Sequence, residues 1–588
     1  MGRLIKFAKP YFWQSILCPF LMVGEVVMEL LIPLYMGKIV DVGIQNGDMH
    51  YVLLTGGKMI LMAAFSLFCG GLAARLAAVA SMGLGARVRE AMFKKLQTFS
   101  FSNIDKFSTA SLVTRMTTDV TTIQNMYQML LRIFFRAPMQ FVFALVLSFR
   151  INHEVSSVFF YVIPLILVTL AIFAPVAYKR FKRMFKMFDG LNASVQENLI
   201  AIRVVKAFVR GDYEKKKFKK ANDDLMAAAI SAEKLMVLAQ PMMMLVLFGT
   251  ILTIAFLSSK FIVAGQMEIG NFAAILTYVM QILFSVIMIA MIFVSYVMSR
   301  ASVSRIEEVL DEVPDINDDH ADRGLKVANG EIEFRDVSFK YNENGKRNVV
   351  DHASFVIHSG ETVGVIGGTG SAKTTLVSLI PRLYDVTSGE VLVAGHNVKD
   401  YTIEELRESV SMVLQNNVLF SGTILDNLRW GDENASEEEV VAACKAAQAH
   451  DFIMSFPDGY QTDLGQGGVN VSGGQKQRLC IARALLKKPK ILILDDSTSA
   501  VDTFTDSKIR EAFRNDFPNT TKLIIAQRIS SVQEADKILV LENGKIADMG
   551  THEELLERSP IYSEVYHSQQ KGTVEEPEGG DGACQVQE

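Results

Sequence analysis

The sequence predicts a multidomain membrane protein, in which a six-helix all-α transmembrane domain is fused to a C-terminal α/β domain. The chain has 588 residues, of which 50% are hydrophobic, and its mean hydropathy is positive. A chain of this length has room for several domains. The long uncharged apolar runs all fall within residues 1–300, whereas residues 325–568 have the composition of an ordinary soluble domain.

Six stretches of the N-terminal half are long and apolar enough to cross a bilayer, which takes about 20 residues per helix. Backbone groups in lipid must be satisfied within their own segment, so each stretch is expected to be a helix. The predicted spans lie near residues 15–40, 53–80, 128–148, 155–178, 236–259 and 269–297.

The charges of the connections predict the orientation. Basic residues crowd the segment 179–220, whereas the short connections on the other side hold only Arg150 and Lys260. By the positive-inside rule, both termini and the two long connections, near 81–127 and 179–235, are cytoplasmic. These connections are too polar for lipid and favour helix. They are therefore expected to be helical extensions of the spans into the cytoplasm.

Two acidic residues lie inside the first span. Glu25 and Glu29 are four positions apart and share one face of a helix. Charge at membrane depth is costly and normally faces a cavity or a partner. One hypothesis is that both residues line a translocation path and favour cationic or polar-headed cargo. The alternative is a structural pairing, with Arg132, with Arg136 or with a second subunit.

Charge and cysteine usage exclude several classes of protein. The net charge of −5 gives no basic signature for nucleic acid. The five cysteines are scattered without a CxxC pair, which indicates neither a zinc site nor a disulfide framework. The N-terminal segment has no small-residue cleavage site after its first apolar run, so no removable signal peptide is expected.

The stretch "ETVGVIGGTGSAKTTLVSLI" (361–380) predicts a strand, a glycine-rich turn and a helix. Such a loop cradles phosphate with backbone N–H groups, while its lysine reaches the β/γ oxygens and its hydroxyl residue binds Mg²⁺. Here these residues are Lys373 and Thr374. Ala372 stands where a glycine normally precedes the lysine, which would weaken the loop if φ must be positive there. The predicted nucleotide contacts are Gly367, Gly368, Thr369, Gly370, Ser371, Ala372, Lys373, Thr374 and Thr375.

The stretch "ILILDDSTSAVD" (491–502) is an apolar strand that ends in Asp495 and Asp496, as expected for a carboxylate delivered to a metal–phosphate site. It follows "VNVSGGQKQRLCIARALL" (469–486). With these motifs the chain resembles the ATP-binding cassette (ABC) family over nearly its whole length. The resemblance implies a half-transporter of the exporter type (type IV fold), with the α/β part as a P-loop nucleotide-binding domain that binds ATP and Mg²⁺.

The implied layout has four parts. They are a transmembrane domain with two cytoplasmic extensions (1–310), a linker (311–325), a nucleotide-binding domain (326–568) and a Gly- and Glu-rich tail expected to be disordered (569–588). The resemblance also implies coupling helices near 104–112 and 208–215, which contact the cassettes. Spans four and five would reach across to the cassette of a partner.

The roles of further residues are implied by the resemblance. Tyr341 matches the aromatic residue that stacks on adenine. Gln415 matches the glutamine that senses Mg²⁺ and relays to the membrane domain, and Asp495 matches the Mg²⁺-coordinating acid. Asp502 matches the loop through which two nucleotide sites communicate. The signature motif, which faces the γ-phosphate held by the other cassette, matches Ser472, Gly473, Gly474 and Gln475.

Three positions depart from the family pattern, besides Ala372. Asp496 replaces the usual Glu that polarises the attacking water, and a general base must come within about 2.6–3.2 Å of the proton it takes. Gln527, in "IIAQRIS", replaces the switch histidine and cannot carry imidazolium charge. Gln466, in "TDLGQGG", stands where exporters usually have Glu in the loop that contacts the coupling helices. The chain's own site is therefore expected to bind ATP and hydrolyse it poorly.

The signature motif is intact, apart from Val471 for the usual Leu. An intact signature is useful only opposite a competent site, so the expected partner is a different half-transporter with the Walker B Glu and the switch His. The sequence resembles the degenerate-site half of bacterial heterodimeric multidrug exporters. We expect a multi-pass subunit of a bacterial inner membrane that moves amphipathic drugs, lipids or peptides outward. An exporter-fold importer of the siderophore type and an ATP-regulated sensor or adaptor subunit are the alternatives.

Overall fold

The computed structural model describes residues 4–342, 345, 347–496 and 501–574 and divides the chain into two compact units. The first unit consists of Met1–Leu96 and Ala110–Asp311. The second consists of Gln97–Thr109 and Glu312–Glu588. A short segment of the predicted transmembrane domain thus folds with the C-terminal unit.

The first unit is entirely helical over its described residues. Six of its helical stretches are long and apolar enough to cross a membrane, which confirms the six predicted spans. The helices are η1 (Leu4–Tyr11), α1 (Phe12–Lys38), η2 (Ile39–Ile44), α2 (Met49–Gln97), α4 (Thr109–Thr114), η3 (Arg115–Asp119), α5 (Val120–Ile151), α6 (His153–Ser156), α7 (Phe159–Ile200), α8 (Ile202–Ala207), α9 (Gly211–Val263) and α10 (Ile269–Asp311).

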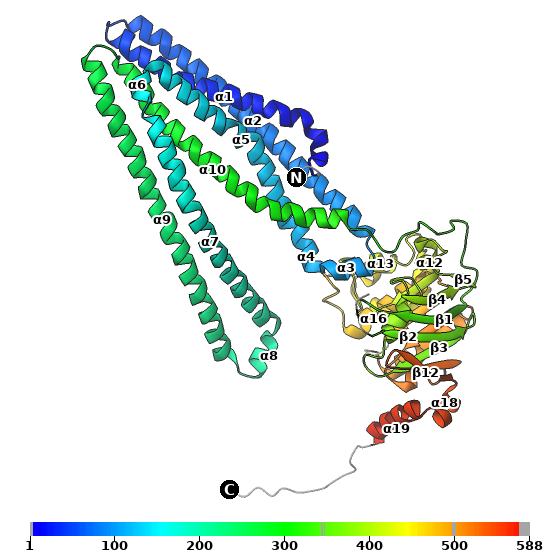
Figure 1. Cartoon of the computed structure of the whole chain (residues 1–588). Helices are drawn as coiled ribbons and strands as arrows, with labels where there is room; N and C mark the ends of the chain where they lie inside the picture. The colour runs from blue at the N-terminus through cyan, green and yellow to red at the C-terminus, as the bar shows by residue number, and fades with distance from the viewer. Residues whose placement is uncertain (1–3, 343–344, 346, 497–500, 575–588) are drawn as a thin grey trace, which may run out of the picture. The chain divides into compact units, whose positions relative to one another are not determined.

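Helices α7 and α9 lie side by side and are joined at one end by the short helix α8 (Figure 1). Near their other ends they share an apolar core with α1, α5 and α10, which includes Ala144, Ile166 and Ile254. In this core the buried Tyr278 hydroxyl donates a hydrogen bond to the Leu30 carbonyl oxygen at 2.7 Å, so the polar end of this side chain has a partner.

The long connections are helical extensions, as the sequence predicts. Helices α2, α7, α9 and α10 each continue well beyond the length that a bilayer requires. The short helices between them lie a few residues earlier than the predicted 104–112 and 208–215. The first, α3 (Phe101–Phe107), and α8 end just before Ser108 and Val209, whose φ angles are +55° and +53°. A residue with a positive φ cannot continue a right-handed helix, so Ser108 and Val209 prevent α3 and α8 from extending further.

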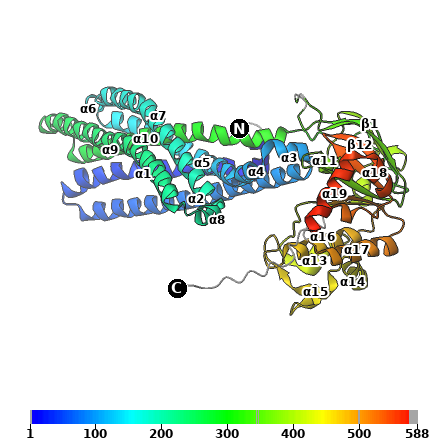
Figure 2. The ribbon, with the colours of Figure 1, turned by 90° about the horizontal axis from the view of Figure 1, so that it is seen from below.

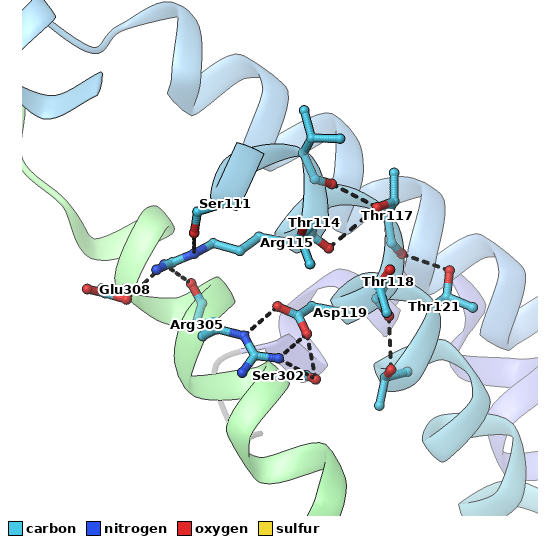
Figure 3. A network of polar contacts seen from close by, with 12 residues as sticks. Ser111, Thr114, Arg115, Thr117, Thr118, Asp119, Thr121, Ser302, Arg305 and Glu308 are labelled. Carbon is cyan, nitrogen blue, oxygen red and sulfur yellow. Dashed lines mark hydrogen bonds and ion pairs between the residues drawn. The ribbon is translucent and has the colours of Figure 1, made fainter. Parts of the chain in front are cut away.

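A polar network joins the π-helical turn η3 to α10 (Figure 3). Asp119, whose side chain is almost fully buried, accepts hydrogen bonds from Ser302 and from the Arg305 guanidinium. Arg115 donates to the Arg305 carbonyl oxygen at 2.7 Å and pairs with Glu308 at 2.8 Å. Because the buried carboxylate is paired and hydrogen-bonded, the cost of burying its charge is offset where the two helices meet.

The second unit is an α/β fold built on three sheets. A six-stranded sheet has the order β12-β11-β3-β10-β9-β6, with β12 antiparallel to an otherwise parallel set. A four-stranded antiparallel sheet has the order β2-β1-β4-β5, and β7 pairs with β8. The strands are β1 (Ile332–Phe339), β2 (Val350–Ile357), β3 (Thr362–Gly367), β4 (Ser388–Val393), β5 (His396–Asn397), β6 (Val410–Val413), β7 (Gly422–Thr423), β8 (Asp463–Leu464), β9 (Ile491–Asp495), β10 (Thr521–Ile525), β11 (Lys537–Glu542) and β12 (Lys545–Gly550).

Helices α13, α14, α15 and α16 gather on one side of this unit, away from β1 and β12 (Figure 2). They share one core with residues of the six-stranded sheet and of the C-terminal helices, while a second core lies between the two large sheets. The helices are α11 (Lys373–Ser378), α12 (Ile403–Ser409), α13 (Ile424–Leu428), α14 (Glu437–Ala446), α15 (His450–Met454), η4 (Gly459–Gln461), α16 (Gly473–Leu486), α17 (Thr503–Asp516), η5 (Ile529–Ser531), α18 (His552–Arg558) and α19 (Pro560–Val574).

Helix α3 belongs to this unit and packs against its four-stranded sheet side through Tyr384. The ring of Phe101 lies 6.0 Å from that of Tyr384, and the Tyr384 hydroxyl donates to Asp105 at 3.0 Å. At the start of α3, the Ser100 hydroxyl donates to Asp315, which follows the end of α10 in sequence. One short helix and the first residues after α10 are thus held on the same surface of the cassette.

The C-terminal boundary differs from the prediction. Helix α19 continues to Val574, so the tail expected to be disordered from residue 569 begins with six helical residues. The prediction is wrong for residues 569–574 because Gly572 and the following Glu-rich run resemble a linker, whereas the helix begins upstream at Pro560, a favoured first helical residue. The rest of the predicted tail, 575–588, lies outside the described residues.

Candidate nucleotide-binding site

Four neighbouring parallel strands deliver the predicted motifs to one edge of the large sheet. In spatial order these strands are β3, β10, β9 and β6. Their carboxyl ends lead to the glycine-rich loop, Gln527, Asp495 with Asp496, and Gln415. Because parallel strands end at the same edge, motifs up to 160 positions apart are brought together, and this edge is where α/β folds bind ligands.

A cavity of about 520 Å³ lies at this edge. Its volume is within the usual range for small-molecule sites, about 300–1,000 Å³. Most predicted contacts line it together with four residues that the sequence did not single out, Val349, Ile366, Ile525 and Val565. The predicted lining residues are Gly367, Gly368, Thr369, Gly370, Ser371, Ala372, Lys373, Thr374, Thr375, Gln415, Asp495, Asp496 and Gln527.

The loop conformation answers the question raised by Ala372. Its φ is +73° and its ψ is 21°, so it is left-handed at the point where α11 begins. Gly370 is left-handed as well, with φ +81°. A left-handed conformation costs a non-glycine residue about 1–2 kcal/mol. The alanine therefore keeps the loop's shape at the expense of backbone strain.

The functional groups of the loop point into the site. Lys373 Nζ lies 2.7 Å from the Gly367 carbonyl oxygen and 2.9 Å from that of Gly368. The Thr374 hydroxyl donates to Asp495 Oδ2 at 2.8 Å. Mg²⁺ prefers oxygen ligands and usually shares them with substrate phosphates. The hydroxyl and carboxylate, with the Gln415 side chain lining the same cavity, fit such an ion.

Asp496 is held by neighbours on three sides. Its φ is +48°, and its backbone N–H donates to the Ile525 carbonyl oxygen at 3.0 Å. The buried Gln477, on α16, donates to the Asp496 carbonyl oxygen at 3.2 Å. Gln527 Nε2 donates to Asp496 Oδ2 at 2.8 Å. The two residues that depart from the family pattern therefore contact each other. Nothing in the spacing of Gln477 indicated its contact with Asp496.

Burial disfavours every charge in the site. It raises the pKa of the Asp495 carboxyl, against the hydrogen bond from Thr374, and the nearby Asp496 charge adds to the rise. It also raises the pKa of Asp496, although hydrogen bonds from Gln527 and Gln415 oppose it. Burial lowers the pKa of Lys373, against the attraction of the two carboxylates. A bound cation would relieve the strain on both acids.

Tyr341 lies beside the loop without lining the described cavity. Its hydroxyl is 2.9 Å from the Thr375 hydroxyl, and its ring packs edge-on against Phe339 and Tyr384. The side chain is 54% exposed. An exposed ring anchored at its hydroxyl end is available for stacking, so the predicted adenine contact stays a prediction.

The signature motif does not join this cavity. Ser472 caps α16 through a reciprocal box with Gln475, and both Ser472 and Gly473 are exposed. A Cβ at Gly473 would meet no atom within 4 Å. Gly474 follows in the first turn of the helix. The N–H groups at the start of α16 are thus open to an anion from outside this site.

Asp502 caps the next helix. Its carboxylate accepts a hydrogen bond from the Thr505 N–H at 2.9 Å, and this bond helps to lower the pKa of Asp502. Residues 497–500, between Asp496 and this cap, lie outside the described residues. The predicted role of Asp502 in communication between sites stays a prediction.

The two membrane carboxylates lie at a different site. Arg136, on α5, pairs with Glu25 at 2.6 Å and with Glu29 at 2.8 Å, both on α1. The structural pairing weighed from the sequence is therefore present. A cavity of about 440 Å³ adjoins it, and neither glutamate is among the residues that line this cavity. The predicted role of both glutamates in a cargo path stays a prediction.

Comparison with known proteins identifies the family. The transmembrane region of ABC transporters matches residues 15–286, and the ABC transporter domain matches residues 350–499. The uncharacterized ABC transporter ATP-binding protein YfiB of Bacillus subtilis (strain 168) is 40% identical over 571 residues, 97% of this chain and 98% of YfiB. The chain belongs to the ABC transporter family.

Two further comparisons define the subgroup. The ATP-dependent lipid A-core flippase of Syntrophus aciditrophicus (strain SB) is 32% identical over 83% of this chain and 80% of the flippase. The solved structure of a bacterial Atm1-family ABC exporter with ATP bound superimposes with a TM-score of 0.78 at 25% identity, over 95% of this chain and 98% of that one. The ABC transporter is therefore a half-transporter of the type IV exporter fold, with an ATP-binding domain that follows six membrane helices.

Proposed function

We propose that this ABC half-transporter is the degenerate-site subunit of a heterodimeric ATP-driven exporter. Its own site binds ATP with Mg²⁺ and hydrolyses it slowly. Its signature motif completes the hydrolytic site of a partner half-transporter that carries the Walker B Glu and the switch His. The pair moves amphipathic drugs, lipids or peptides out of the cytoplasm, across a bacterial inner membrane with both termini inside.

The hydrogen bond between Gln527 and Asp496 carries this proposal. A side chain that takes a proton from water needs a free acceptor oxygen within reach of that water. Asp496 is one methylene shorter than Glu, about 1.5 Å. One of its oxygens already accepts from the Gln527 amide at 2.8 Å. An uncharged amide at the switch position offers no imidazolium to the γ-phosphate.

ATP binding needs none of the departing groups. The glycine-rich loop supplies backbone N–H donors, and Lys373 supplies a positive charge. Thr374 and Asp495 are the residues that would hold Mg²⁺, with Gln415 as a third oxygen donor. An Mg²⁺ ion held by these residues would supply positive charge to offset the negative charge of the phosphates. Tyr341 offers a ring for the adenine, and ATP bound in this way would hold the two cassettes together.

The start of α16 supports the second half of the proposal. Ser472 and Gly473 are exposed and lie apart from the chain's own cavity. The open N-terminus of a 14-residue helix favours an anion through its N–H groups and its dipole. That anion is the γ-phosphate on the partner's phosphate loop. The chain therefore contributes to hydrolysis through a surface that its own ATP does not use.

The fate of the γ-phosphate tests the proposal. The assembled heterodimer is allowed to turn over with 8-azido-ATP labelled at either the α- or the γ-phosphate and is then photo-crosslinked. We expect this chain to retain both labels, because its ATP stays intact, and the partner to retain only the α-label. Loss of the γ-label from both chains at equal rates would overturn the proposal.

A further inference from the structure

A second cavity, within the first unit, has an unusual lining. It encloses about 440 Å³ between α1, α5 and α10. On α5 the lining residues recur every three to four positions and so share one helix face. Two of them are arginines and none is acidic. The lining residues are Met22, Asn125, Gln128, Met129, Arg132, Ile133, Arg136 and Met288.

The two arginines differ in their partners. Arg136 holds Glu25 and Glu29 at 2.6 and 2.8 Å. Arg132 forms no ion pair with a carboxylate of the described residues, although the buried Nε atoms of both arginines alike have no hydrogen-bond partner among them. Arg132 lies in the predicted third span, where an unpaired charge is costly. A cation is thus kept at membrane depth beside a cavity without a counterion from the part of the chain that the structure describes.

The rest of the lining suits the tail of an amphiphile. Met22, Met129 and Met288 come from three different helices and carry flexible, polarizable thioethers that adapt to irregular apolar shapes. Gln128 and Asn125 add amide donors about one and two turns along α5 from Arg132. Guanidinium and amide donors from α5, together with apolar side chains from all three helices, match a ligand with an acidic head and an alkyl chain.

We propose that this cavity binds the acidic head of an amphiphile, with Arg132 as its counterion. The inference rests on the proposed function as an exporter of amphipathic cargo and names the chemical class of that cargo. Glu25 and Glu29 have a different part in this arrangement from the cationic-cargo role predicted from the sequence. They neutralise and orient Arg136, and two carboxylates against one guanidinium leave an excess negative charge that weakens anion binding nearby.

Equilibrium binding to the full-length chain tests the proposal without ATP or a partner, so it is independent of heterodimer formation and hydrolysis. The chain is placed in phosphatidylcholine nanodiscs, and empty nanodiscs are subtracted. The probes are radiolabelled dodecyl phosphate, dodecyltrimethylammonium and inorganic phosphate. We expect saturable binding of dodecyl phosphate, weaker binding of inorganic phosphate, and none of the cationic amphiphile at the same site.

Three variants are expected to change the affinity for dodecyl phosphate in three different ways. Arg132→Gln should weaken dodecyl phosphate binding by about ten- to a hundredfold, the usual loss for a hydrogen bond to a charged group. Glu25→Gln should tighten it several-fold, because Arg136 then keeps a single carboxylate. Arg150→Gln, at the other end of the same helix and outside the cavity, is the matched control and should leave binding unchanged. A purely structural arginine would not give opposite changes at Arg132 and Glu25.

Two results would overturn the proposal. One is unchanged dodecyl phosphate binding by Arg132→Gln together with weaker association of subunits, since Arg132 would then pair with a carboxylate of a second subunit. The other is equal binding of the cationic and anionic amphiphiles. If Arg132→Gln fails to fold, Arg132→Lys keeps the charge without the planar fork. If the Lys variant binds dodecyl phosphate with an intermediate affinity, the proposal is supported. If it binds dodecyl phosphate and dodecyltrimethylammonium equally well, the proposal is contradicted.

Discussion

The glycine-rich loop site and the start of α16 lie in one unit but are built differently. The loop site holds two non-glycine residues in the left-handed region, Ala372 and Asp496, and its shortened acid is engaged by Gln527. The start of α16 is regular. The backbone of Ser472 is extended, with φ −68° and ψ 163°, and its capping box is complete. The space around Gly473 is open.

This difference is what the proposed function expects of a chain that keeps its half of a partner's composite site and has impaired hydrolysis at its own. Ala372, Asp496 and Gln527 all line the loop site, so under the proposed function they impair hydrolysis only of the ATP that this chain itself holds. The exposed helix start remains available to a different phosphate loop. The contrast between the two surfaces therefore supports an asymmetric pair of subunits, and variants at each surface test it.

Ser472→Asp should have the largest effect. Aspartate caps a helix as well as serine does, so the fold is kept. The added carboxylate would face the partner's γ-phosphate and repel it. We expect ATPase activity of the heterodimer to fall by about 10²–10³-fold, as when a preorganised donor to a developing charge is removed.

The matched control is Ser436→Asp. Ser436 caps α14 through the same reciprocal box, with Glu439 at the third helical position, but lies outside both nucleotide surfaces. Thermal stability and ATPase activity of this variant should match the wild type. Equal losses in both variants would indicate a fold defect and would remove the contrast between the two surfaces.

The double variant Asp496→Glu/Gln527→His should restore chemistry to the degenerate half. The longer acid regains its reach and the imidazole can contact the γ-phosphate, so turnover at this chain's own site should rise by about 10²-fold, the lower range for a general base. The assay uses a heterodimer whose partner carries Walker B Glu→Gln. Adding Lys373→Met should return the rate to background, and a double variant without gain would contradict the assigned roles.

Lys373→Met should weaken ATP binding without unfolding the domain. Loss of a charged hydrogen-bond donor costs about 1.5–3 kcal/mol, which is about ten- to a hundredfold in affinity. Fluorescence titration of the chain with a labelled ATP analogue measures the change. Lys545→Met, a 65% exposed lysine outside the cavity, is the control and should bind like the wild type.

Ala372→Gly should have the smallest effect and a positive sign. Glycine removes about 1–2 kcal/mol of left-handed strain from the folded state. Because glycine also makes the unfolded chain more flexible, the free energy of unfolding should rise by only about 0.5–1 kcal/mol. Thermal unfolding should therefore shift upwards. Ala442→Gly, at an exposed position within α14, should shift it downwards by about 1 kcal/mol. Two shifts of the same sign would refute the strain at Ala372.

Much of this architecture could be predicted from the sequence because its signals are local and strong. Six apolar stretches of span length mark six helices, and an apolar strand before "GGTGSAKTT" marks the loop site. Parallel strand ends then predict that Asp495 and the loop meet. The lengths and residue types alone fix these features, since a bilayer and a phosphate each impose one geometry.

The remaining features depend on packing between distant positions. Whether Glu25 pairs with Arg132 or Arg136 depends on how α1 lies against α5, and both arginines share one helix face. The left-handed φ of Ala372 follows from the turn between β3 and α11, not from alanine itself. The end of α3 likewise follows from the backbone at Ser108. No residue pattern encodes these choices.

The most direct test of the asymmetric account is the ATPase activity of this chain alone and with its partner, each with and without Walker B Glu→Gln in the partner. If the pair is asymmetric, activity appears only in the pair and disappears when the partner's Glu is replaced. If this chain alone hydrolyses ATP at the rate of the pair, Asp496 and Gln527 are competent substitutes, and a symmetric homodimer replaces the asymmetric pair.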